Sequence, residues 1–441
     1  MSVDNVFREL YFNSTPGFGR KADVEICQNG LGVNRAYLKI CLFELRRTHT
    51  FGKNMLHCEY KDDFIYHLIK MIEIEIDGTT MFQNNSFALR LADIASESDA
   101  AVKHFGKIHY ENNGPVVYYP LNLSQIFQES VSYGSNSKLP LNYKGIRLCD
   151  ALKTSFKMYV TFGEIKDLFD FELKKSDYGV IPLPTDFTFA PSDWKIEHAS
   201  LFCNYDLDPM SNLSVPIPQS VYPIRQTVSH WITQKEEFEA AFTIIKCKLL
   251  PPTEFAHITK LNAITDIVFR VYFSNTDSIN PKRESRSIWV SKYKFQLNGH
   301  DIANEDTVSL ANLEYQLKGR VISSENEFIR PVTIGMEPDP DPYVRINIFD
   351  TVNPILDSSN NVFGYCPHIK NFDMEKDVLQ LNLWLSYFRK IDPKEKYTVE
   401  CCFKVNYELT YDLDGTCRFP CLIKPETYVS TPNIPFEDIA F

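Results

Sequence analysis

The sequence has few of the features that mark membrane, secreted or nucleic-acid-binding proteins. Its 441 residues contain no stretch of 18 consecutive apolar residues, and the opening MSVDNVFREL has neither the basic nor the apolar segment of a secretion signal. We therefore expect a chain that is neither secreted nor membrane-spanning. The 57 acidic residues outnumber the 46 basic ones, and no run of like charges is long enough to form a nucleic-acid-binding arm. Direct binding of nucleic acid is not expected.

Motifs for catalysis are also missing. The sequence contains no Gly-rich phosphate loop and no GxSxG or HExxH pattern. Its 11 cysteines are odd in number and irregularly spaced, which favours reduced core thiols over a disulfide framework. These absences predict that the chain is not an enzyme and that it has no catalytic, cofactor-binding or metal-binding residues.

The cysteines near the end of the chain suggest a zinc site at first sight. Cys401, Cys402, Cys417 and Cys421 could supply four thiolates. However, Cys401 and Cys402 are adjacent on a predicted strand and point to opposite faces of it, so they do not readily share one tetrahedral site. Core or surface thiols are the favoured interpretation.

Two further patterns contain residue types that could carry chemistry. Glu337, Asp339 and Asp341 offer oxygen ligands for calcium, but they lack the Gly turn and the closing Glu of a dedicated loop, which favours a solvated loop. Cys366 and His368 could act as nucleophile and base. Nothing nearby in the sequence offers an oxyanion cradle, so a catalytic role is disfavoured.

The carboxylates of Glu73, Glu75 and Asp77 could serve as the acid pair of a glycosidase, an activity that also occurs on β-sandwiches. Their regular alternation with isoleucine already explains them as the solvent or subunit face of a strand. A carbohydrate-active protein remains an alternative of another functional class.

What the sequence does contain points to β-structure. It is 44% hydrophobic and 13% aromatic, with 32 Phe and 23 Tyr, a composition typical of half-buried pleated sheets. Alternation of apolar residues predicts strands at Ile72–Ile76, Phe156–Phe162, Tyr293–Leu297, Leu379–Leu385 and Tyr397–Leu409. The first of these is followed by a turn at Gly78 and the third by a turn at Asn298 and Gly299. Helical spacing is scarce and is found at Val3, Phe7 and Leu10, at 123–127 and at 228–242. We therefore predict an all-β protein with a few short helices.

The alternation lapses between Phe162 and Trp194, where Pro182, Pro184 and Pro191 interrupt strand pairing. We place a domain boundary there. The predicted division is an N-terminal arm at 1–20, a first sandwich with its connector at 21–194, and a second sandwich with a C-terminal tail at 195–441. Each half follows a similar order of strands, turns and long loops, as two diverged copies of one architecture would.

Five sets of motifs follow one another along most of the chain. They are Ile65–Gly78 followed by Leu89–Ile94, Tyr119–Leu121 with Leu139–Leu141 and Ser155–Phe162, Ala199–Asp208, Ile264–Phe273 with Leu297–Gly299, and Asn371–Asp373 with Val405–Gly415. In this order they resemble the double jelly-roll major capsid proteins of DNA viruses, a group that includes iridovirus-like, virophage and Polinton or adintovirus proteins. In that family, Ser155–Phe162 would be the last strand of the first jelly roll, and Ala199–Asp208 would open the second.

The resemblance implies two tandem jelly rolls in one chain and a homotrimer that presents six sandwiches as a pseudo-hexagonal capsomer. Its implied partners are neighbouring capsomers and minor capsid or penton proteins, with possible indirect contact to an internal membrane, and its implied location is the virion, after assembly in the host cytoplasm or nucleus. The N-terminal arm would dock beneath the capsomer, and the loops at 124–140 and 336–362 would make outer or intersubunit contacts. A poxvirus-like assembly scaffold with the same fold is the rival within this class.

Overall fold

A computed structural model describes most of the chain. The described residues are 5–42, 48–51, 54–61, 64–95, 106–111, 114–131, 137–175, 180–181, 195–207, 223–249, 258, 260–274, 288–306, 356–357, 362–365, 369–387 and 391–419.

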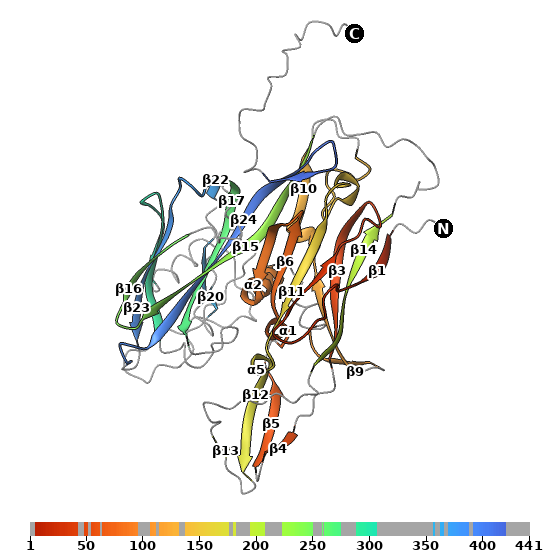
Figure 1. Ribbon diagram of the computed structural model, residues 1–441. Coiled ribbons are helices and arrows are strands. Elements are labelled where there is room, and N and C mark those ends of the chain that lie inside the picture. Colours follow the sequence, from red (N-terminus) through yellow and green to blue (C-terminus); the bar gives the residue numbers. More distant parts are fainter. Residues whose placement is uncertain are drawn as a thin grey trace, which may run out of the picture.

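Two β-sandwiches stand side by side in this structure (Figure 1). The first is built from β1 (Asn5–Tyr11), β2 (Lys21–Glu25), β3 (Gly32–Leu42), β6 (Ile69–Ile76), β7 (Thr79–Asn85), β9 (Gly114–Leu121), β11 (Phe156–Phe162) and β14 (Ile196–Asp206). The second is built from β15 (Ile224–Glu239), β16 (Ile244–Lys248), β17 (Lys260–Phe273), β18 (Ile288–Leu297), β19 (His300–Asp306), β21 (Val362–Tyr365), β23 (Leu379–Tyr387) and β24 (Lys396–Tyr411).

The two sandwiches share one strand order. In the first, one sheet runs β1-β14-β3-β9 and the other β2-β11-β6-β7. In the second, the corresponding sheets run β15-β24-β17-β21 and β16-β23-β18-β19. When the eight strands of each sandwich are numbered in chain order, the larger sheet has the strand order 1-8-3-6 in both sandwiches. The sheet that faces it has the order 2-7-4-5 in both. This antiparallel arrangement of eight strands in two sheets is the jelly roll, so the predicted all-β double jelly roll is confirmed.

Shorter strands and helices complete the fold. Three strands extend sheets of the two sandwiches at an edge and two pair alongside them, namely β8 (His109–Glu111), β10 (Phe127–Val131), β20 (Leu356–Asp357), β22 (Ile369–Asp373) and β25 (Cys417–Arg418). The helices are α1 (Phe64–Leu68), α2 (Ser86–Ala95), α4 (Leu123–Ile126), α5 (Ile165–Leu168) and the 3-10 turn η1 (Leu148–Asp150). No helix in the described residues combines the length and apolarity that crossing a bilayer requires.

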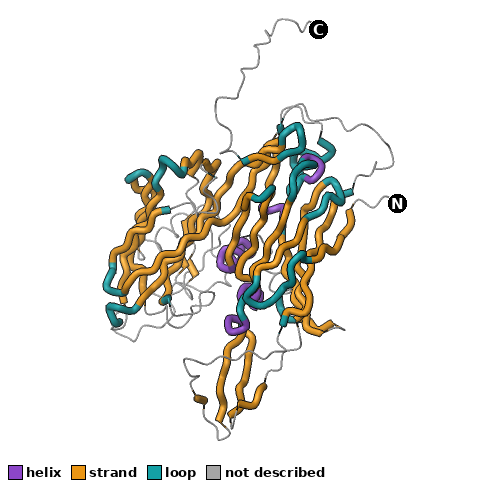
Figure 2. The backbone as a smooth tube through the Cα atoms, viewed as in Figure 1, coloured by secondary structure: helices purple, strands orange, loops and turns teal. Residues whose placement is uncertain are grey.

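A small separate sheet projects from one end of the first sandwich (Figures 1 and 2). It consists of β4 (Thr48–Phe51), β5 (Asn54–Tyr60), β12 (Phe169–Lys175) and β13 (Val180–Ile181) in the order β13-β12-β5-β4. Its strands come from the connections that follow the third and seventh strands of the first sandwich.

The alternation read from the sequence determines which side chains form the core. Along β11, Phe156, Met158, Val160 and Phe162 are buried while Lys157, Tyr159 and Thr161 are partly exposed. The hairpins that join the fourth and fifth strands turn at Asp77-Gly78 and at Asn298-Gly299, and all four of these residues have positive φ. Two successive residues with positive φ form a type I′ turn, whose twist matches that of the flanking strands. Both predicted turns are thus confirmed.

The strand pairing shows that the predicted boundary between the sandwiches is wrong. β14, expected in the second jelly roll, pairs with β3 and β1 and is the eighth strand of the first. It follows that β11, expected to be the last strand of the first sandwich, is its seventh. The irregular segment after Phe162 is the connection between these two strands and contains β12 and β13. On strand pairing, the first sandwich ends at Asp206 and the second begins at Ile224.

Two sequence-based expectations of helix are also wrong. The spacing of Val3, Phe7 and Leu10 predicts a helical stripe in an arm, but Asn5–Tyr11 is a strand whose seven residues all pair with β14. The spacing at 228–242 also predicts a helix, whereas this segment lies largely in β15. In both cases strand pairing with distant segments overrides a weak local pattern. The expected helix at 123–127 is present as α4.

Candidate functional site

The junction between the two sandwiches combines strand pairing, buried polar side chains and a docked helix. β15 and β24 are each 16 residues long and pair in register along their entire length, from Ile224 opposite Tyr411 to Glu239 opposite Lys396. One half of this ladder belongs to the second sandwich. The other half reaches the first sandwich, where β10 adds to the free edge of β15 (Figure 1).

Gln226 secures this strand addition. Its side-chain Nε2 donates to the carbonyl oxygens of Gln128 at 2.9 Å and of Gly145 at 3.0 Å, both in the first sandwich. The Tyr411 hydroxyl in turn donates to Gln226 Oε1 at 2.6 Å. Because Gln226 is fully buried, these bonds satisfy polar groups that would otherwise be desolvated without partners. The expected contact loop at 124–140 therefore contributes β10 to a contact within the chain, whereas most of 336–362 lies outside the described residues.

A network around Arg147 holds residues 137–140, which follow β10 in the chain. The Arg147 side chain is fully buried, with Nε donating to Asp150 at 2.7 Å and Nη1 to the Pro140 carbonyl at 2.8 Å. Its Nη2 donates to the Leu139 carbonyl at 2.9 Å and to Ser137 Oγ at 3.0 Å. One guanidinium thereby fixes residues 137–140 against η1.

The fifth strand of the first sandwich also contacts β15. The His230 ring lies between Phe82, at 6.1 Å between ring centroids, and Tyr407, at 5.4 Å in an edge-to-face arrangement. The Tyr407 hydroxyl donates to the Met81 carbonyl. Burial lowers the pKa of His230 to about 3, so the imidazole is neutral at physiological pH.

Helix α2 covers the outer face of the second sandwich's larger sheet, as Figure 2 shows between the two sandwiches. Asn85 starts this helix, its Oδ1 accepting the backbone N–H of Ala88 at 2.9 Å in the manner of an N-cap. The apolar side of α2 then forms a separate buried cluster with three strands; its members are Phe87, Ala88, Leu91, Trp231, Val268 and Cys402.

A buried ion pair lies beside this cluster. Arg270 on β17 donates to Glu400 on β24 from Nε at 2.8 Å and from Nη2 at 2.5 Å, and both side chains are almost fully buried. The guanidinium carbon of Arg270 also lies 3.6 Å from the centroid of the Phe87 ring, a cation–π contact with the first sandwich. Lys235 and Asn85 reach the other oxygen of Glu400, at 3.2 and 3.3 Å.

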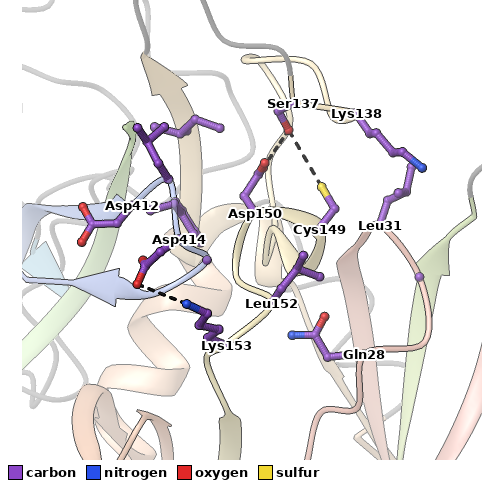
Figure 3. A pocket seen from close by; sticks show the side chains of 15 residues that line it. Gln28, Leu31, Ser137, Lys138, Cys149, Asp150, Leu152, Lys153, Asp412 and Asp414 are labelled. Atoms are coloured by element: carbon purple, nitrogen blue, oxygen red, sulfur yellow. Dashed lines mark hydrogen bonds and ion pairs between the residues drawn. The ribbon is translucent and has the colours of Figure 1, made fainter. Parts of the chain in front are cut away.

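A cleft of about 790 Å³ opens at one end of the junction (Figure 3). Its carboxylates are already engaged: Asp150 pairs with Arg147, Asp412 with Arg418, and Asp414 with Lys153 at 3.5 Å. Burial raises the pKa of the Cys149 thiol to about 12, which leaves it protonated and unreactive. The lining residues therefore provide no activated nucleophile or base.

In the part of the chain that the structure describes, the residues with a candidate chemical role are not brought together. Cys401 and Cys402 lie in two different buried clusters on opposite faces of β24, as expected. Glu73 forms an ion pair with Lys21 at 2.5 Å but is itself buried, so the predicted solvent face is wrong at this position, while Glu75 is partly exposed and Asp77 exposed. Among the described residues, no group of His, Cys, Asp or Glu is arranged to hold a metal. Cys366, His368, Cys421 and the acidic series at 337–341 lie outside the described residues.

Comparison with solved structures identifies the same architecture. The chain is similar to the capsid of the virus PBCV-1, with 12% identity over 94% of this chain and 96% of that one and a TM-score of 0.56. It is also similar to the major capsid protein of Faustovirus, with 7% identity over 92% and 90% of the two chains and a TM-score of 0.52. No family model and no curated protein sequence matches it. At these identities the likeness establishes the fold, as the sequence motifs predicted.

The buried ion pair leads to a stability prediction. Glu400→Gln leaves Arg270 buried without its counter-charge, and we expect a loss of about 3–5 kcal/mol in unfolding free energy, measured by urea titration. The matched control is Glu408→Gln on the same strand. The partner of Glu408 is Arg225, whose Nε lies 3.5 Å from the carboxylate and whose side chain is half exposed. The control should cost less than about 1 kcal/mol. Equal effects of the two substitutions would contradict the assigned role of Glu400.

The buried histidine predicts a pH dependence. The unfolded chain takes up a proton on this imidazole below about pH 6.5, whereas the folded chain does so only near pH 3. Stability is therefore complete above pH 6.5 and falls with acidification by about 1.4 kcal/mol per pH unit until the folded pKa is reached. Between pH 7 and pH 5, the wild type should lose about 2 kcal/mol more than His230→Leu. Parallel losses in both proteins would argue against this contribution.

Proposed function

We propose that the chain is a major capsid protein that assembles as a trimeric, pseudo-hexagonal capsomer into the icosahedral shell of a DNA virus. The observation that carries the proposal is the repetition of one jelly-roll topology in two sandwiches joined by an extensive junction. Three such chains supply six similar sandwiches, the number needed for a hexagonal outline. The likeness to the capsid of PBCV-1 and to the Faustovirus major capsid protein supports the same role.

The junction suits a shell subunit rather than a catalyst. The pairing of β10 with β15, the docked helix α2 and the contacts of Phe87 and Asn85 with the buried ion pair join the two sandwiches into one unit. Such a unit can repeat identically in a lattice. Oligomers commonly close by symmetry, which for a three-fold ring requires two different complementary faces on each chain. We infer that the chain works in the virion with neighbouring capsomers and minor capsid or penton proteins, and without direct contact to the genome.

The test is the mass of the purified chain in solution combined with electron microscopy of the particles. We expect the mass of three 51.0 kDa chains and a hexagonal outline in projection. A stable monomer that forms no lattice at high concentration would refute the proposal.

Two rivals are separated by further measurements. A scaffold of the poxvirus type is shed during maturation, so retention of the chain in purified mature particles excludes that role. A carbohydrate-active protein would hydrolyse or bind oligosaccharides, and Glu73→Gln with Glu75→Gln would abolish this. We expect neither hydrolysis nor binding from the wild type.

A further inference from the structure

The outer face of the first sandwich's larger sheet carries a row of aromatic rings that crosses four strands. Phe7 on β1, Phe202 on β14, Tyr37 on β3 and Tyr118 on β9 form this row, which we call the aromatic stripe. Phe202 and Tyr37 stack with centroids 4.7 Å apart and planes 6° from parallel, and Tyr37 contacts Phe7 and Tyr118 at 5.9 and 6.0 Å. Phe7 is 51% exposed, so the stripe is an ordered apolar surface in contact with water. Such a surface on a soluble protein commonly marks an interaction site.

The internal repeat indicates what kind of group covers this stripe. The equivalent strands of the second sandwich are β15, β24 and β17, and their outward side chains include Trp231, Cys402 and Val268. These residues are covered by α2 of the first sandwich, and Trp231 is only 2% exposed. The same face is therefore covered by a neighbouring jelly roll in one half of the chain and open in the other half.

The outer face of the second sandwich's smaller sheet is complementary to the aromatic stripe. On β16, β23 and β18 this face carries four lysines, namely Lys246, Lys248, Lys292 and Lys294. The neighbouring strand β19 adds one carboxylate, Asp301, which pairs with Lys294 at 2.8 Å and leaves the other three lysines as the net charge of the face. Trp384 lies among them, with Lys292 Nζ 5.6 Å from its ring centroid. Lys246 and Lys248 are exposed on the edge strand β16. We call this surface the lysine face.

Ammonium groups and aromatic rings attract each other through the ring quadrupole, more strongly when water is removed. The aromatic stripe already binds one cation in this way, since Lys39 Nζ lies 5.7 Å from the Tyr118 centroid. Carboxylates flank the rings at Glu9 on β1 and Glu111 on β8; both are exposed, and Glu111 already pairs with Lys39 at 3.1 Å. The junction within the chain uses the same chemistry where Arg270 meets Phe87.

We propose that the aromatic stripe of one chain binds the lysine face of a second copy of the same chain. This inference rests on the proposed function and adds to it the two surfaces that meet. The contact is heterologous, because the two faces differ, and successive chains joined head to tail by such a contact close into a ring when the rotation allows. It would repeat between chains the arrangement in which one jelly roll covers the next within the chain.

The experiment uses two full-length variants, one that disrupts the aromatic stripe and one that disrupts the lysine face. Phe202→Lys places a cation in the stripe opposite the lysine face, and Lys246→Glu with Lys248→Glu removes two cations from the other side. We expect each variant alone to be monomeric at concentrations at which the wild type is oligomeric, as measured by light scattering. The matched control is Tyr159→Lys, which changes a partly exposed aromatic on the outer face of the first sandwich's other sheet and should leave the oligomer intact.

Mixing the two variants tests the pairing of the faces. The Phe202→Lys chain retains a normal lysine face and the Lys246/Lys248 variant retains a normal stripe, so the mixture should form heterodimers that neither component forms alone. Normal assembly by the lysine variant would overturn the proposal while leaving the capsid function in place, since the stripe would then have another occupant. A monomeric wild type would instead defeat the proposed function itself. Circular dichroism and thermal unfolding check that each variant is folded. If Phe202→Lys does not fold, the variant with Lys246→Glu and Lys248→Glu decides the test alone.

Discussion

The pairing of β15 with β24 is the interaction on which the rest of the structure depends. Each of its 16 positions is in register, whereas most of the longer ladders in the described structure contain an irregularity. The ladder therefore runs unbroken from the second sandwich to the edge of the first. One end closes the second sandwich and the other end accepts β10 and contacts Met81 and Phe82 of the first. The two sandwiches are thus held by shared strands as well as by surface contact.

The repeated topology then gives equivalent positions different environments. Trp231 and Phe7 both lie on the first strand of their sandwich and on the outer face of its larger sheet, yet one is covered by α2 and the other is open to water. A single chain has only one such junction to offer internally. The equivalent face of the first sandwich, which carries Phe7, has no such cover within the chain. This difference between two sandwiches of the same topology is the structural reason to look for a second molecule on that face.

The sequence was informative wherever the decisive interaction is local. Alternation located the core strands, and Asp77-Gly78 and Asn298-Gly299 identified two hairpins because positive φ strongly restricts residue type. Alternation does not record which strand is the neighbour, and for that reason β14 was assigned to the wrong sandwich. Arg270 and Glu400 stand as single charges in apolar runs, which signals a buried partner, but 130 residues separate them and nothing local pairs them. The aromatic stripe could not be predicted from the sequence for the same reason, because its four rings come from four strands that are far apart in the chain.

The buried ion pair matters more for register than for net stability. Arg270 and Glu400 occupy directly opposed positions on β17 and β24, and Lys235 faces Glu400 from β15 on the other side. Desolvation offsets much of the attraction in such a pair, so replacing it with apolar residues costs little. A slip of β24 by one residue is different, because it turns every side chain to the opposite face. Glu400 would then enter the core among apolar residues, away from both cations. The pair therefore penalises the wrong register heavily, and the register of β24 is what holds the two jelly rolls in place.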